Sequence, residues 1–169
     1  MSSSLKYLLL SGLFLLSACG FEPMYGEHSA LATHTPLEGN LVIDPIPGRN
    51  GQIMKAALEN KFNPEGIKPI NPEYHLQASL IQTLLPTIIT ANGTIQRYDI
   101  RLDSDFKLMR TKDNKVLFTG STYRSGSYNV APNENFSTYE AEQSAIQNVL
   151  NEMSEDYVLR LTGYFAKQQ

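Results

Sequence analysis

The chain has 169 residues, of which 41% are hydrophobic and 18% are charged, and its formal net charge is −3. This is the composition of a globular chain long enough for one domain, and it argues against disorder. A mildly acidic chain without a run of lysine or arginine argues against general nucleic-acid binding, and no internal apolar run reaches the roughly 20 residues of a transmembrane helix.

The first 18 residues have the pattern of a bacterial secretion signal. Lys6 gives a positive start, Tyr7 to Leu16 is apolar, and Leu16-Ser17-Ala18-Cys19 resembles the lipobox at which bacterial lipoproteins are cleaved. Cys19 is the only cysteine in the chain, and its thiolate can form a thioether to a diacylglyceryl group. We expect residues 1–18 to be removed and Cys19 to carry diacylglycerol and an N-acyl chain, which anchor the protein to a membrane. An ordinary signal followed by a chance cysteine is the alternative.

Residues 19–39 predict a lipidated, flexible tether in front of a single domain at 40–169. The tether is rich in glycine, proline, serine and threonine and has little periodicity. Gly20 follows the cysteine, at the position where an aspartate retains lipoproteins in the inner membrane in the best-known sorting systems. The absence of that aspartate resembles an outer-membrane address.

A short strand and a helix are predicted at the start of the domain. Leu41-Val42-Ile43 is apolar and β-branched, and prolines follow it, which is typical of a strand. Asn50 can cap a helix that ends at Phe62, because Asn63 precedes a proline and disfavours helix. The residues expected to share the buried face of this helix are Ile53, Ala56, Ala57 and Phe62.

Alternation of apolar and polar residues predicts three long antiparallel strands. The first runs from Tyr74 to Leu84 and is ended by Pro86, with a turn at Ala91-Asn92-Gly93. The second covers 97–108, and Lys112 to Lys115 forms the hairpin tip that follows it. The third runs from Val116 to about Val130. The apolar face of the second strand comprises Tyr98, Ile100, Leu102, Phe106 and Leu108, and Gly120 and Gly126 in the third mark bulges or close packing.

A long amphipathic helix closes the chain. Ser137-Thr138-Tyr139-Glu140 has the form of a capping box, with Phe136 placed as its hydrophobic staple, and the helix is expected to reach about Lys167. The element order is therefore β-α-β-β-β-α. We predict an α+β, two-layer sandwich with a mostly antiparallel four-stranded sheet, covered on one face by two helices. The apolar residues that recur at helical spacing are Ala145, Ile146, Val149, Leu150, Met153, Tyr157, Leu161 and Tyr164.

The sequence offers no residues from which to assemble a catalytic or metal site, so we expect a protein that is not an enzyme and has no cofactor or metal. Three carboxylates share a face of the second long strand and could suggest acid–base chemistry or calcium binding. Cations alternate with them, which favours charge pairing on a solvated face. These residues are Asp99, Asp103 and Asp105, interleaved with Arg97, Arg101 and Lys107.

Four segments together resemble the lipopolysaccharide-assembly lipoproteins of the LptE family in their alphaproteobacterial form. They lie in the family's order and spacing, and the resemblance covers essentially the whole chain. The segments are Cys19-Gly20-Phe21-Glu22-Pro23-Met24-Tyr25-Gly26, Gly48-Arg49 with Asn63-Pro64-Glu65-Gly66, Ser125-Gly126-Ser127-Tyr128-Asn129-Val130, and Ser137-Thr138-Tyr139-Glu140-Ala141-Glu142.

The resemblance implies a role without catalysis. Members of this family lie inside the lumen of the outer-membrane β-barrel LptD and help to deliver lipopolysaccharide to the outer leaflet. It therefore implies two partners, an LptD-type barrel and lipopolysaccharide, and a lipid-anchored position on the periplasmic face of the outer membrane.

Lipopolysaccharide carries phosphates, which lysine and arginine recognise. We therefore predict that Lys112 and Lys115 at the hairpin tip, and Arg97 and Arg101 on the solvated sheet face, bind lipopolysaccharide. The alternative is that these cations only keep exposed positions soluble. Two other functions compete with the barrel plug. One is a free, periplasm-facing lipid-binding protein or chaperone, and the other is a lipid-anchored hydrolase, which would need a deep pocket with convergent titratable groups.

Overall fold

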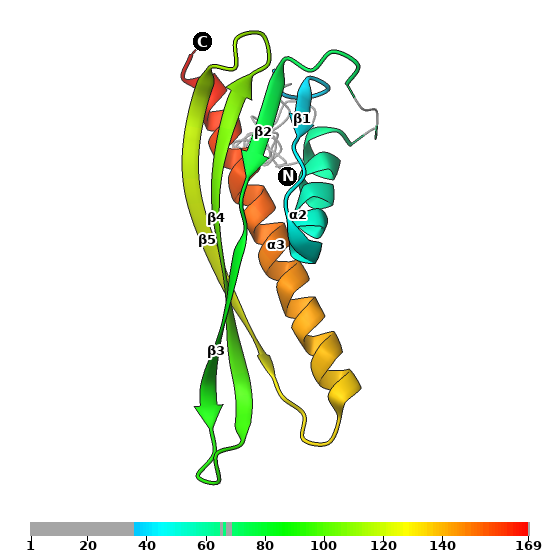
Figure 1. The fold of residues 1–169 in the computed structure, drawn as a ribbon, viewed down its shortest axis with the longest axis vertical. Helices are drawn as coiled ribbons and strands as arrows, with labels where there is room; N and C mark the ends of the chain where they lie inside the picture. The colour runs from blue at the N-terminus through cyan, green and yellow to red at the C-terminus, as the bar shows by residue number, and fades with distance from the viewer. Residues whose placement is uncertain (1–35, 65, 67–68, 169) are drawn as a thin grey trace, which may run out of the picture. The chain divides into compact units, whose positions relative to one another are not determined.

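The computed structural model describes residues 36–64, 66 and 69–168. Cys19, the predicted signal sequence and most of the predicted tether lie outside the described residues. The elements are β1 (Leu41–Ile43), α2 (Gly48–Phe62), β2 (Tyr74–Ala78), β3 (Ile81–Ile89), β4 (Ile95–Arg110), β5 (Val116–Asn129) and α3 (Asn135–Ala166) (Figure 1).

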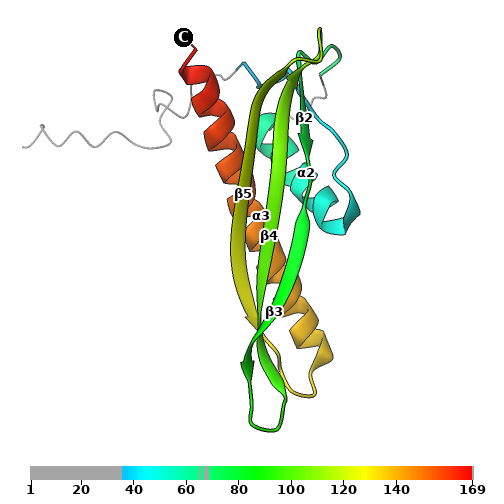
Figure 2. The same cartoon turned by 60° about the vertical axis from the view of Figure 1, so that its left-hand side comes forward.

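The five strands form one mixed, mostly antiparallel sheet, and the predicted α+β class is confirmed. The sheet is built around β4. β5 lies along one side of β4 for nearly its whole length, while β2 and β3 follow one another along the other side (Figure 2). β1 pairs with β2 in parallel, and it is the only parallel pair among the described strands.

The predicted number of four strands is wrong, because the run from Tyr74 to Leu84 forms two strands. The run breaks at Ser79 and Leu80, where the Ser104 hydroxyl donates to the Ser79 carbonyl and lies 2.6 Å from the Tyr157 hydroxyl on α3. The second piece, β3, continues through Pro86 to Ile89 instead of ending there. A proline is tolerated at this position because β3 is an edge strand, whose outer side needs no ladder hydrogen bond.

Helix α2 ends at Phe62 as predicted, but its start and its buried face differ from the prediction. Asn50 does not cap it, because the helix begins two residues earlier, after Pro47, without a side-chain cap. The Asn50 side chain donates instead to Gln82 at 2.6 Å. The predicted face was wrong at Ala56, which is exposed; the buried residues are Gly51, Met54, Leu58 and Phe62, spaced three or four apart.

The predicted capping box of the last helix is also wrong. α3 starts at Asn135, and Ser137 lies inside its first turn, where its hydroxyl donates to the Glu134 carboxylate at 2.9 Å. Thr138 accepts a hydrogen bond from the Ala131 backbone at 3.0 Å, and Phe136 is exposed rather than stapled. The predicted length is confirmed, since α3 ends at Ala166 after 32 residues, or about 48 Å of helix.

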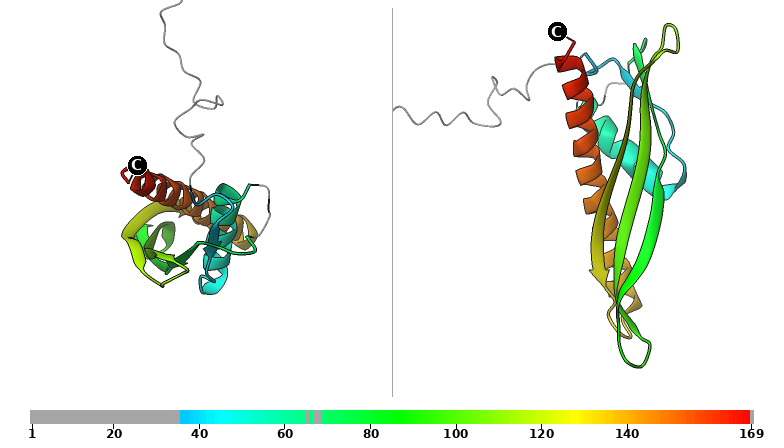
Figure 3. Two further views of the ribbon diagram at one scale, coloured as in Figure 1. Left: turned by 90° about the horizontal axis from the view of Figure 1, so that it is seen from above. Right: turned by 90° about the vertical axis from the view of Figure 1, so that its left-hand side faces the viewer.

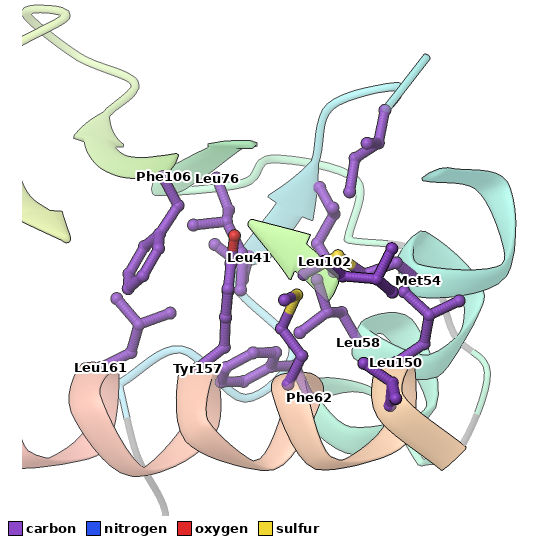
Figure 4. Packing of buried hydrophobic residues seen from close by; sticks show 14 of the residues in the cluster. Leu41, Met54, Leu58, Phe62, Leu76, Leu102, Phe106, Leu150, Tyr157 and Leu161 are labelled. Carbon is purple, nitrogen blue, oxygen red and sulfur yellow. The ribbon is translucent and has the colours of Figure 1, made fainter. Parts of the chain in front are cut away.

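The core lies between the two helices and one face of the sheet (Figures 3 and 4). Tyr157 is fully buried and stacks on Phe106, with 4.0 Å between the ring centroids. Leu37, which the sequence assigns to the tether, is also fully buried in this core. The other large, fully buried side chains include Leu41, Met54, Leu58, Leu76, Ile100, Leu102, Leu108, Leu150 and Met153.

Two glycines of β5 permit this close packing. A Cβ at Gly120 would lie 2.6 Å from Cζ of Phe106, and one at Gly126 would lie 2.8 Å from Cγ2 of Val149 on α3. The register shift between β4 and β5 is located elsewhere, between Leu108 and Met109. Of the two predicted explanations for these glycines, close packing is therefore confirmed and a bulge is not.

Candidate functional site

The four cations predicted to bind lipopolysaccharide fall into two separate groups. Arg97 and Arg101 lie near the start of β4, on the face turned away from the helices. Lys112 and Lys115 lie at the turn between β4 and β5, beyond its other end. Because a strand extends about 3.3 Å per residue, roughly 35 Å of β4 separate the two groups. One phosphate cannot contact both.

Arg101 is held by its neighbours on the sheet. Its Nε and Nη2 donate to the two carboxylate oxygens of Asp103 at 2.9 and 2.8 Å, and its guanidinium lies 4.1 Å from the centre of the Tyr123 ring. The hydrogen bonding between Arg101 and Asp103 raises the pKa of Arg101 and lowers the pKa of Asp103. A phosphate arriving here would compete with an existing bidentate pair.

Arg97 is also close to groups that neutralise it. Its Nη2 donates to the Ser127 hydroxyl on β5, and its Nε lies 4.0 Å from the Asp99 carboxylate. The expected charge pairing along β4 is thus confirmed for Asp99 and Asp103. Among the residues that the structure describes, no three histidine, cysteine, aspartate or glutamate side chains gather as metal ligands would.

The turn after β4 presents its cations more freely. Within residues 69–168, neither Lys112 nor Lys115 has an ion-pair partner. Asp113 is the acid nearest to them in sequence; it lies 3.7 Å from Arg110 and accepts a backbone hydrogen bond from Lys115 at 3.2 Å. Asn114 adopts φ of 52°, the left-handed conformation that this tight turn requires.

Arg110 is a member of this group that the sequence analysis missed. With Lys112 it borders a cavity of about 410 Å³, which Glu73, Tyr74, Thr111 and Pro72 also line. The sequence did contain a signal for it. Near the end of β4 the even-numbered residues Phe106 and Leu108 are apolar, and Arg110 is a charged residue at the next even-numbered position. Three cations and the carboxylates of Asp113 and Glu73 therefore surround one end of the sheet, and this end can attract an anionic group.

A second hollow lies where β2 gives way to β3. It has a volume of about 680 Å³, and polar and charged residues that share a face of the sheet line it, including Gln77, Asp105, Lys107, Thr119 and Ser121. Opposite charges side by side on this wall give it no net charge, so it suits an anion less well than the turn after β4.

The remaining predicted site, Cys19, lies outside the described residues, so its lipidation stays a prediction. None of the helices that the structure describes combines the length and the apolar character needed to cross a membrane.

Comparison with known proteins assigns the family. The model of the family "LptE: Lipopolysaccharide-assembly" matches residues 39–161. This range contains all five strands, α2 and most of α3. A comparison with curated protein sequences gives no match.

Solved structures share the fold at low sequence identity. A Caulobacter crescentus protein described as a lipoprotein has 17% identity and a TM-score of 0.65, covering 80% of this chain and 98% of its own. Lipoprotein B of Nitrosomonas europaea has 11% identity and a TM-score of 0.60, over 78% and 86% of the two chains. Rare lipoprotein B of Shewanella oneidensis has 10% identity and a TM-score of 0.51, over 72% and 89%. At such identities the structures support the fold, while the family model carries the assignment: the chain belongs to LptE, a family of non-catalytic lipoproteins that act in lipopolysaccharide assembly.

Proposed function

We propose that this protein is an outer-membrane lipoprotein that plugs an LptD-type β-barrel and assists the assembly of lipopolysaccharide into the outer leaflet. The observation that carries the proposal is the family match over 39–161, which spans nearly the whole folded part. The start of the mature chain, from Cys19 to Gly26, further suggests the alphaproteobacterial type of the family.

The proposed anchor is a diacylglyceryl group with an N-acyl chain, such as palmitate, on Cys19 after cleavage of the signal peptide at 1–18. More than one acyl chain makes membrane attachment stable. The tether from Cys19 would keep the folded domain on the periplasmic face of the membrane and raise its effective concentration at the barrel.

The helix-free face of the sheet supports the proposed place in a barrel lumen. β4 carries alternating cations and anions there, and these pair with one another: Arg97 with Asp99 and Arg101 with Asp103. A self-neutralising polar face is compatible with the water-filled interior of a large outer-membrane barrel.

For lipopolysaccharide we favour the turn after β4. Lys112 and Lys115 have no ion-pair partner among the described residues, whereas Arg97 and Arg101 already hold partners. Arg110 adds a third cation beside the cavity at this turn. Arg97 and Arg101 stay in the proposal as a second contact for a large, multiply phosphorylated ligand.

The test is isolation of the full-length, tagged lipoprotein from native outer membranes in mild detergent. The proteins that co-purify with it are identified by mass spectrometry. Stoichiometric recovery of one LptD-type barrel is expected. Recovery of the lipoprotein alone, from membranes that contain such a barrel, would refute the plug. It would favour the second candidate, a free periplasm-facing lipid-binding protein or chaperone, for which the exposed apolar residues of β3 are the supporting observation.

A further inference from the structure

β3 is an exposed edge strand without charges. The sequence has no aspartate, glutamate, lysine or arginine from Leu76 to Gln96, and all nine residues of β3 are exposed. Sheet edges are usually protected by charged side chains. Here the strand instead presents large apolar side chains that are 41–61% exposed. These residues, named here the β3 apolar row, are Ile81, Leu84, Leu85, Ile88 and Ile89.

The row projects from both faces of the sheet. Leu84 lies opposite the buried Ile100, on the helix side, whereas Ile81 and Leu85 lie opposite Asp103 and Asp99, on the charged side. Among the described residues, α3 packs on β4 and β5, and the backbone of neither helix comes close to that of β3. Figure 1 shows the β3–β4 hairpin diverging from α3 toward its turn. A flat partner would cover one face only, so an occupant of the whole row has to surround this edge.

We propose that the β3 apolar row is the surface that the barrel partner encloses, and that the part of the barrel facing it is apolar and uncharged. This inference rests on the proposed function. An ionised group of the partner buried against the row would lose its hydration, and β3 has no charge to offset this loss. The nearest charges on β4, Asp99 and Asp103, already pair with arginines of the same strand. Because barrel lumens are otherwise polar, an apolar area on the wall is a specific expectation.

A second copy of the chain fits this edge less well. Pro86 lies in the middle of β3 and has no backbone N–H, and the ladder with β4 shifts register directly after it. A continuous ladder from β3 to β3 is therefore interrupted at its centre. The row is suited to packing of side chains into a surrounding surface rather than to strand pairing.

The test places a charge on the row in the full-length lipoprotein, expressed in membranes that contain the barrel. The variants are Leu85→Lys and Ile88→Lys, with Leu159→Lys as the matched control, because Leu159 is an exposed leucine on α3. The LptD-type barrel recovered per lipoprotein is quantified by mass spectrometry. We expect both row variants to lower this ratio at least tenfold and the control to leave it within twofold of the wild type.

Two further measurements separate the possible outcomes. Thermal unfolding of each purified lipoprotein checks its fold, and a photo-crosslinking amino acid at Leu85 gives a readout without an added charge; it should join to apolar segments of the barrel. Unchanged recovery of the barrel by both row variants would overturn the inference while the proposed function stands. Crosslinks to a second copy, to lipopolysaccharide or to charged barrel segments would also overturn it. If the wild type recovers no barrel, the proposed function fails and this inference fails with it.

Discussion

Asp156 on α3 binds two arginines that come from different elements. Arg124 of β5 lies 3.3 Å from one carboxylate oxygen, and Arg160, one turn further along α3, donates to the other at 2.7 Å. Burial alone would raise the pKa of Asp156, but a hydrogen bond to Thr122 and the charges of Arg160 and Arg124 outweigh it, and the pKa is lowered. The ion pair therefore fastens the helix to the sheet only while Asp156 is ionised.

This linkage predicts a pH dependence of stability. Because the pKa of Asp156 is lower in the folded than in the unfolded state, its contribution is complete above the unfolded value near 3.9 and is lost as pH falls through the folded value. In urea unfolding at pH 7, Asp156→Asn should be less stable than the wild type by about 1–3 kcal/mol. The difference should shrink as the pH is lowered below about 4. A difference independent of pH would show that the charge of Asp156 is not involved.

At the turn after β4 the prediction concerns ligand binding. Lys112→Glu and Lys115→Glu should each weaken binding of purified lipopolysaccharide several-fold, because each replaces a cation with an anion near the ligand's phosphates. Arg49→Glu, at an exposed position at the start of α2, is the control with the same change of charge. Binding is measured by titration with lipopolysaccharide, and circular dichroism verifies the fold. Equal effects of all three variants would point to net charge rather than to a site at the turn.

At the scale of elements, the contact of β5 with α3 can be tested with two glycines. Gly126→Ala should destabilise the protein by about 1–3 kcal/mol, because the added methyl would lie 2.8 Å from Val149 of α3. Gly163→Ala is the matched change, since nothing lies within 4 Å of its Cβ position in α3. It should stabilise by about 0.5–1 kcal/mol through helix propensity. Thermal unfolding measures both, and a neutral Gly126→Ala would mean that α3 shifts easily on the sheet.

Strands and helices differed in how well the sequence predicted them. β4 and most of α3 have strong periodic patterns and β5 has a weaker one, and the structure confirms all three elements. The break after Ala78 was missed because it coincides with tertiary contacts between residues distant in sequence: the Ser104 hydroxyl donates to the Ser79 carbonyl and is itself hydrogen-bonded to Tyr157. The predicted end of the strand at Pro86 failed because local rules do not reveal that β3 is an edge strand.

Helix starts were also predicted poorly, for a physical reason. Neither α2 nor α3 has a side-chain cap, so residues that look like caps serve other contacts. For the candidate site, residue type and turn position were enough to separate the Lys112 and Lys115 group from Arg97 and Arg101. The bidentate hydrogen bonding of Arg101 to Asp103 depends on the rotamers of both side chains, which a sequence pattern does not contain.

At the scale of the whole described domain, stability should be unevenly distributed. The core residues cluster around α2, α3 and the helix side of β4, while β3 is exposed throughout and pairs in the sheet with β4 alone. In hydrogen-exchange mass spectrometry of the isolated protein, peptides from 80–95 should exchange at least tenfold faster than peptides from 104–110. Uniform protection would show that the edge is stable without a partner.

The position of α3 in the sequence has a consequence for the order of folding. This last helix contributes Ile146, Val149, Leu150, Met153, Tyr157 and Leu161 to the core, and it packs on β4, β5 and α2. A chain that emerges N-terminus first, from a ribosome or through a secretion channel, cannot close its core until these residues are free. Until then its strands, including the apolar β3, lack the helix that packs on the sheet. Exposed strand edges in such a partly folded chain are prone to aggregation. Folding of this protein is therefore a late event, completed only when the C-terminal helix has emerged.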